Sequence, residues 1–137
     1  MRQIKVKMPI SVELGKKKKK KYYLNLNIMR NQVGHLINNV KREYKRIAAG
    51  CIPQGWYFEN YSLHYTLYLP DRRKRDISNV LSICDKNFTD SLVELGYVPE
   101  DNYYFLREVT YKLGGYDKNF RGYVDIIVKE EKYEEMQ

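Results

Sequence analysis

The strongest constraint on the fold is a change of hydrophobic period on either side of one charged segment. Over Tyr61–Leu69 apolar residues occupy every second position, and Pro70 ends the pattern. Over Ser78–Leu95 the apolar spacing becomes three or four residues, and Gly96 follows. A period of two predicts a strand with one buried face, and the longer period predicts an amphipathic helix. The chain is therefore expected to contain a strand, a charged loop and a helix in direct succession.

The same two patterns recur along the rest of the chain. Further strands are predicted at Ile4–Met8, Leu24–Ile28, Val109–Leu113 and Tyr123–Val128. A first amphipathic helix is predicted at Asn31–Ala49. Because Gly114–Gly115 opens a loop between the last two strands, these strands are expected to pair as a hairpin. The order of the elements predicts an α+β fold, with two main helices packed on a mixed β-sheet.

Length and charge limit the domain organisation and the partners. The 137 residues are expected to form one domain, 1–137, with a frayed tail at 130–137. The formal net charge of +8 favours a polyanionic partner, and nucleic acid in particular. No apolar run reaches the roughly 20 residues of a membrane helix. An anionic membrane surface would call for a basic amphipathic helix, whereas the charge here is spread along the chain.

The N-terminus and the two cysteines bear on location. Lys5, Lys7 and Glu13 fall where a signal peptide would be apolar, so an intracellular protein is expected. Cys51 and Cys84 lack metal-ligand spacing and are expected to be buried, reduced thiols.

Two basic segments are candidates for contacts with DNA phosphates. One is a run of six lysines: Lys16, Lys17, Lys18, Lys19, Lys20 and Lys21. Their mutual repulsion predicts a loop or strand extension that projects into solvent, and a solvated tip without function is the competing interpretation. The other segment comprises Arg72, Arg73, Lys74 and Arg75. It lies where a strand leads into a helix, whose N-terminus adds free amides and partial positive charge.

Carboxylates near the second basic segment raise the question of a metal site. Asp76 ends that segment, Asp85 lies on the predicted helix, and Glu100 and Asp101 occupy the turn beyond it. Two or more carboxylates converging on Mg²⁺ could activate a water for attack on a phosphodiester. Salt bridges to neighbouring cations are the competing interpretation.

Two motifs resemble those of a known protein family. They read Asp71-Arg72-Arg73-Lys74-Arg75-Asp76-Ile77-Ser78-Asn79 and Gly96-Tyr97-Val98-Pro99-Glu100-Asp101. Together they resemble the RusA family of Holliday junction resolvases. The family pattern is a strand ending in Pro-Asp, a basic run, Asp-x-Asp-Asn opening a helix, Lys and Asp one turn apart, then Gly and a double acid. This chain matches it at Pro70-Asp71, Asp76, Asn79, Lys86, Asp90, Gly96 and Glu100-Asp101.

The chain departs from the family pattern in two places. Ser78 stands where the family has its second aspartate, and a serine cannot supply an anionic ligand. The helix is also about four residues longer between Asn79 and Lys86, which is close to one 3.6-residue turn and nearly keeps the helix faces. Because Asp85 lies about 20° around the helix from Ser78, we expect Asp85 to replace the missing ligand.

The resemblance implies a RusA-like, homodimeric, Mg²⁺-dependent endonuclease of phage or prophage type, with Mn²⁺ as a substitute ion. Such an enzyme binds four-way DNA junctions in a bacterial cytoplasm and resolves them by paired symmetric cuts, and it needs no small-molecule cofactor. The implied metal ligands are Asp76, Asp85 and Asp101, with Glu100 as a ligand or an acid beside the ligands. Lys86 would neutralise charge on the cleaved phosphate. Asn79 and the two basic segments would contact the DNA.

Two other functions remain open from the sequence. A non-catalytic recombination accessory protein would bind the DNA junction after losing activity through Ser78. A small interaction protein would use its charges only as a solvated surface. Four tyrosines near the charged segments are candidates for stacking on unpaired bases, although packing is the favoured interpretation: Tyr22, Tyr23, Tyr103 and Tyr104.

Overall fold

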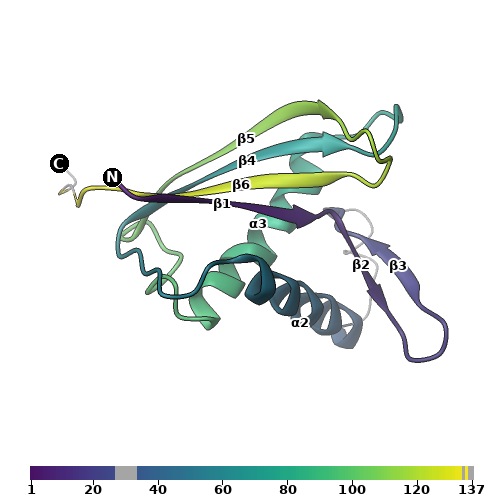
Figure 1. The fold of residues 1–137 in the computed structure, drawn as a ribbon, viewed down its shortest axis with the longest axis horizontal. Helices are drawn as coiled ribbons and strands as arrows, with labels where there is room; N and C mark the ends of the chain where they lie inside the picture. The colour runs from purple at the N-terminus through teal and green to yellow at the C-terminus, as the bar shows by residue number, and fades with distance from the viewer. Residues whose placement is uncertain (27–33, 134, 136–137) are drawn as a thin grey trace.

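The computed structural model describes residues 1–26, 34–133 and 135 of the chain (Figure 1). Its elements in order are β1 (Gln3–Pro9), β2 (Ser11–Leu14), β3 (Lys20–Tyr23), α2 (Gly34–Cys51), β4 (Tyr61–Leu69), α3 (Ile77–Glu94), β5 (Leu106–Tyr116) and β6 (Tyr123–Glu130). The predicted helix start at Asn31 and the predicted strand residues Asn27 and Ile28 lie outside the described residues. Within them, no helix combines the length and apolar character needed to cross a membrane.

Four strands form the main sheet in the order β1-β6-β4-β5. β4 and β5 run parallel, whereas β6 is antiparallel to both β1 and β4. α2 and α3 cover the same face of this sheet (Figure 1). The α+β prediction, with helices on a mixed sheet, is therefore confirmed.

The core lies between the covered face of the sheet and the two helices. β1 and β6 bury alternate residues, and β4 buries Tyr61, Leu63, Tyr65 and Leu67. From α3 the buried apolar side chains are Val80, Leu81, Cys84, Phe88 and Leu92. Each large side chain buried here contributes about 1.5–3 kcal/mol to folding. This packing fixes which face of α3 remains available for chemistry.

The predicted hairpin of the last two strands is wrong. β4 lies between β5 and β6, so these two strands do not pair with each other. The reason is the β4–α3–β5 unit, since a helical crossover returns the chain parallel to the strand it left. Gly114 and Gly115 belong to β5 and not to a loop. A Cβ at Gly114 would lie only 2.6 Å from the Tyr68 ring, so the glycine is needed for this close packing.

The predicted second strand, Leu24–Ile28, is also wrong where the structure describes it. The strands in this region are β2 and β3, which form a separate two-stranded antiparallel sheet around the lysine run. Leu24 is buried just beyond β3, and its N–H donates to the Ile10 carbonyl over 2.8 Å. All six lysines are exposed, which confirms the prediction of a projecting strand extension.

The cysteine prediction is half correct. Both cysteines are free, and Cys84 is buried, but Cys51 is exposed. Cys51 is the last residue of α2 and lies outside that helix's buried stripe. Burial raises the pKa of the Cys84 thiol to about 12.

Candidate functional site

Asp76 begins α3 as its N-cap residue. Its backbone is extended, and its Oδ1 accepts a 2.9 Å hydrogen bond from the Ser78 N–H. Aspartate is favoured at this position because its carboxylate satisfies an amide that the helix leaves unpaired. Asp76 thus has a structural role that needs no metal, and its exposed carboxylate still faces solvent.

Asp85 is held by three hydroxyl groups. Its Oδ1 accepts hydrogen bonds from Tyr65 at 2.7 Å and Thr89 at 2.9 Å, and its Oδ2 accepts one from Tyr111 at 2.9 Å. Burial and the nearby Asp85 charge raise the pKa of both tyrosine hydroxyls, so they remain donors. β4, β5 and α3 together therefore fix a carboxylate in the helix–sheet seam.

The turn after α3 brings two more acids toward this seam. The Tyr61 hydroxyl donates to the Glu100 carbonyl over 2.8 Å. Burial raises the pKa of Tyr61, and the charges of Asp101, Asp85 and Glu100 raise it further. Glu100 therefore lies beside Tyr61, whereas Asp85 contacts Tyr65, four residues further along β4. We call Asp85, Glu100 and Asp101 together the acidic cluster, although these three described residues do not converge on one metal-sized site.

Lys86 supplies a cation at the edge of the acidic cluster. Its Nζ donates to Asp90 over 3.1 Å, one helical turn away. That hydrogen bond raises the pKa of Lys86, and the charges of Asp90, Asp101 and Asp85 add to the effect. Asp90 also binds Lys41 of α2 at 3.1 Å. The Lys86 ammonium is exposed and remains able to meet an anionic substrate.

The structure does not place all the predicted metal ligands together. Asp76 and Asp85 are nine positions apart in sequence, about 13.5 Å along the α3 axis. Glu100 and Asp101 follow the opposite end of the helix from Asp76. In the described part of the chain, no three Asp, Glu, His or Cys side chains converge closely enough to hold a metal ion. Mg²⁺ commonly binds one or two carboxylates and keeps several waters, so the acidic cluster still offers suitable oxygen ligands.

We call the segment from Asp71 to Arg75 the basic loop, and some of its side chains form hydrogen bonds within the loop. Asp71 accepts hydrogen bonds from the Arg75 guanidinium at 3.1 Å and from the Arg73 N–H at 2.9 Å, which together lower the pKa of Asp71 to about 2. Arg72 lies over the Tyr116 ring, 4.9 Å from its centroid. Among the described residues Arg73 and Lys74 form no ion pair, and both are exposed. These two cations are the members of the basic loop most available to an external anion.

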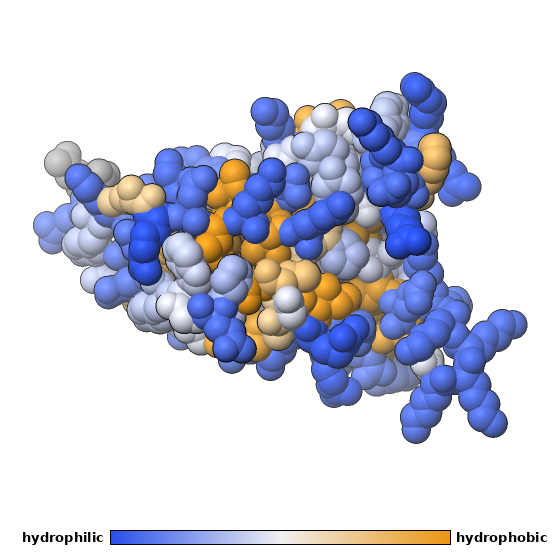
Figure 2. All heavy atoms as spheres, in the orientation of Figure 1, coloured by the Kyte–Doolittle hydropathy of each residue, from blue (hydrophilic) through white to orange (hydrophobic). Residues whose placement is uncertain are grey.

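The basic loop and the turn that carries Glu100 lie at opposite ends of β4, and Asp85 lies between them beside Tyr65. Tyr61 starts this nine-residue strand and the basic loop follows its end, a distance of about 30 Å. The β2–β3 hairpin lies at the basic end (Figure 1). The hydrogen bond to Asp71 raises the pKa of Arg75, and Tyr23 of β3 adds to the effect. Figure 2 shows long hydrophilic side chains projecting at that end. Asn79, in the first turn of α3, also belongs to it.

No family model and no curated protein matches the chain. The choice of function therefore depends on the geometry of the acidic cluster and the basic end.

Sequence reasoning missed the hydroxyl groups that hold Asp85. Tyr61 and Tyr65 were correctly placed on the buried face of a strand, but the hydrogen bonds of Tyr61 to the turn after α3 and of Tyr65 to α3 itself were not expected. The sequence feature that could have indicated these hydrogen bonds is the presence of a tyrosine on each of two predicted strands, Tyr65 on one and Tyr111 on the other. Of the four candidate stacking tyrosines, Tyr103 is the most exposed at 72%, and it lies beyond the acidic cluster rather than at the basic end.

Proposed function

We propose that the protein is a RusA-like, metal-dependent endodeoxyribonuclease that resolves four-way DNA junctions by paired cuts in a bacterial cytoplasm. The observation that carries the proposal is Asp85, held in the helix–sheet seam with Lys86 beside it on α3, the helix that the basic loop precedes, while Glu100 and Asp101 lie in the turn after that helix. Carboxylates and a lysine are the groups needed to bind a divalent metal and to neutralise a cleaved phosphate. A basic end suits the DNA backbone.

Asp85 and Asp101 are the proposed ligands of Mg²⁺, with Glu100 as a further ligand or an acid beside them. The bound ion would polarise the scissile phosphate and activate a water. Tyr65 and Tyr111 keep Asp85 in one orientation through hydrogen bonds of 2.7 and 2.9 Å. Lys86 would offset negative charge that builds up on the phosphate.

A homodimer accounts for the distance between Asp76 and the acidic cluster. A two-fold axis perpendicular to α3 would reverse one helix relative to its copy, so the Asp76 end of one α3 helix would face the Asp101 end of the other. Both ends would then contribute to each of two equivalent sites, which matches the paired cuts. Mixing Asp76→Asn chains with Asp101→Asn chains should therefore restore cleavage at one of the two sites. Failure of the mixture to cut would show that the site needs no residue from the second chain.

The test of the activity is cleavage of a synthetic four-way junction and of a matched linear duplex, with Mg²⁺ or EDTA. We expect symmetric nicks in the junction alone, only with the metal, and lost in Asp76→Asn and Asp101→Asn. Lys86→Ala should slow cleavage about a hundredfold. Asp125→Asn is the control, because Asp125 lies on β6, outside the proposed site, and forms an ion pair with Lys5 of β1 at 3.5 Å. Equal cleavage by Asp101→Asn and the control would contradict the proposed site.

A non-catalytic junction-binding accessory protein is the second candidate. It is favoured by the hydroxyl groups that already occupy both oxygens of Asp85. This function predicts that the wild type binds the junction with the same affinity with or without the metal, and that neither Mg²⁺ nor Mn²⁺ produces cuts.

A further inference from the structure

The loop between β5 and β6, residues 117–122, is built around one carboxylate. Asp117 accepts hydrogen bonds from the N–H groups of Asn119 at 2.9 Å, Arg121 at 3.2 Å and Gly122 at 2.9 Å. These bonds hold the pKa of Asp117 below its usual value, and the nearby charge of Lys7 adds to the effect. The Asp117 N–H donates to the Leu69 carbonyl over 2.7 Å, so the loop is tied to the end of β4.

The same loop holds Phe120 in an unusual conformation. Phe120 has a φ of 58°, and among the described residues it is the one non-glycine with positive φ. Its side chain is 81% exposed. A left-handed backbone is costly for a bulky residue, and an exposed phenyl ring recovers none of that cost by burial. Strain of this kind is concentrated at functional sites.

Gly122, at the end of the loop, packs closely against Ile10 and Pro70. Its φ is 77°, and a Cβ there would lie 2.6 Å from Ile10 Cδ1 and 2.9 Å from Pro70 Cδ. The loop is therefore anchored on both sides of Phe120, by Asp117 before it and by Gly122 after it. The exposed ring is presented by a fixed backbone.

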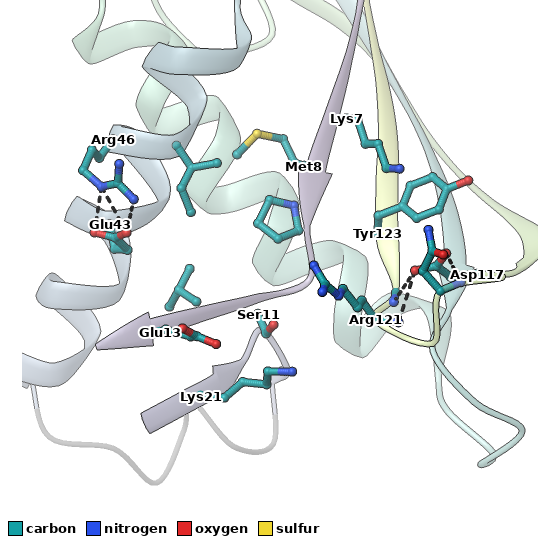
Figure 3. A pocket seen from close by; sticks show the side chains of 15 residues that line it. Lys7, Met8, Ser11, Glu13, Lys21, Glu43, Arg46, Asp117, Arg121 and Tyr123 are labelled. Atoms are coloured by element: carbon teal, nitrogen blue, oxygen red, sulfur yellow. Dashed lines mark hydrogen bonds and ion pairs between the residues drawn. The ribbon is translucent and has the colours of Figure 1, made fainter. Parts of the chain in front are cut away.

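A cavity of about 1050 Å³ lies beside the loop, among β1, β2, β3 and α2. Figure 3 shows Lys21 and Arg121 extending toward the same space near Ser11. In the described part of the chain neither cation forms an ion pair. A space of this size with converging cations suits a phosphate group and its sugar.

Two of the three acids that line the cavity already accept hydrogen bonds from the protein. Glu43 accepts two 3.1 Å hydrogen bonds from Arg46 Nε, and Asp117 is occupied by the loop amides. Glu13 on β2 is exposed to solvent. At the outer margin Lys7 lies over the Tyr123 ring, 4.0 Å from its centroid (Figure 3). The four cations of the lining, Lys7, Lys21, Arg46 and Arg121, outnumber its three acids, and Glu13 lies opposite Lys21 in the β2–β3 register.

The cavity and the loop continue the basic end. Pro70, which precedes the basic loop, packs against Gly122, and Arg72 stacks on Tyr116 at the end of β5. A DNA strand on the basic loop would therefore reach Phe120 and Arg121 without leaving the protein surface.

We propose that the 117–122 loop is a second DNA contact, in which Phe120 stacks on a base left unpaired at the branch while Arg121 and Lys21 bind the adjoining phosphate in the cavity. The inference rests on the proposed function, since it takes the ligand to be branched DNA. Apolar side chains that insert at distorted steps and aromatic platforms for unpaired bases are both established modes of nucleic-acid recognition. A phenyl ring stacks on any base, so this contact would recognise the unpaired base at the branch and not a particular DNA sequence.

The test is binding of a four-way junction that carries 2-aminopurine at the branch, in EDTA so that cleavage does not interfere. Phe120→Gly is the informative variant, because glycine accepts the positive φ and the protein stays folded. We expect its Kd for the junction to rise about tenfold, its affinity for linear duplex to stay unchanged, and the 2-aminopurine response to disappear. Phe120→Trp should keep all three properties, and Tyr57→Ala is the matched control at another exposed aromatic residue.

Arg121→Ala tests the phosphate contact against Lys129→Ala, which removes the same charge from the far end of β6. We expect Arg121→Ala, and not the control, to weaken junction binding and to lower its salt dependence. If Phe120→Gly binds the junction as the wild type does, with the same 2-aminopurine response, the inference is refuted and the proposed function stands. If Phe120→Gly instead changes the oligomeric state, the ring serves a protein interface and the inference fails. If the wild type shows no salt-sensitive binding to the junction, both fail.

Discussion

Removal of the Asp85 carboxylate should destabilise the protein as well as inactivate it. Asp85→Ala deletes the acceptor that Tyr65, Thr89 and Tyr111 share. Asp85→Asn keeps one acceptor oxygen and most of the shape. The two variants therefore separate the structural role of this side chain from its proposed role as a metal ligand.

The size of the effect follows from the exposure of each donor. Tyr65 is 1% exposed, so in Asp85→Ala its hydroxyl would lose the carboxylate acceptor without gaining water, at a cost of about 1–3 kcal/mol. Tyr111 is 38% exposed, and water can replace its lost bond. Thr89 keeps its 2.7 Å hydrogen bond to the Asp85 carbonyl. We expect a total loss of about 2–3 kcal/mol in the free energy of unfolding.

The assay is urea unfolding followed by far-UV circular dichroism, with Tyr65→Phe, Asp85→Ala and the double variant completing a mutant cycle. Because Tyr65→Phe removes the unpaired hydroxyl, the double variant should be little less stable than Asp85→Ala, with a coupling of about 1–2 kcal/mol. Asp125→Ala should cost less than about 1 kcal/mol. Additive effects, or an Asp85→Ala midpoint equal to that of the wild type, would refute the reasoning. Junction cleavage should survive Tyr65→Phe and be lost in Asp85→Asn.

Four further outcomes are expected. Replacing Arg73 and Lys74 by alanine should reduce the slope of log K against log salt for junction binding by about 1.8, since each phosphate contact contributes about 0.9; an unchanged slope would exclude both residues from the interface. Gly122→Ala should lower the free energy of unfolding by at least about 1–2 kcal/mol, because Gly122 has a positive φ and an added Cβ would meet Ile10. Thermal unfolding measures the loss, and Gly50→Ala is the control because a Cβ at Gly50 meets open space. A thiol reagent at pH 8 should modify one cysteine in the native protein and two in denaturant. Two reactive thiols in the native state would contradict the burial of Cys84. Burial raises the pKa of Cys84 to about 12, so between about pH 9 and 12 only the unfolded chain releases this proton. The free energy of unfolding should therefore fall as pH rises through that range.

Local pattern was enough to predict the elements that carry the acidic cluster. β4 and α3 agree with their predicted ranges, and Tyr61 and Tyr65 lie on the buried face as expected. These features depend on the period of apolar residues along a single segment, which a sequence displays directly. The exposure of the lysine run also followed from sequence, because charge repulsion acts between neighbours in the chain.

Pairing between distant segments was not predictable in the same way. The chain places β5 beside β4 because α3 must cover that edge of the sheet, and this removes the expected hairpin with β6. The neighbours of the Asp85 carboxylate come from three elements, so no local spacing announces them. Phe120 was overlooked because nothing in its sequence neighbours reveals a positive φ or an exposed ring.

The sequence by itself determined the secondary structure of the central unit, the basic character and the residue types available for chemistry. Only the tertiary structure decided which of these residues meet: Asp85 meets Tyr65, Thr89 and Tyr111, while Asp76 caps the start of α3. The physical reason is that α3 has 18 residues and is about 27 Å long, so it separates the acids that precede it in the motif from those that follow it. Side-chain convergence depends on how strands and helices pack, and that packing is fixed by burial over the whole domain.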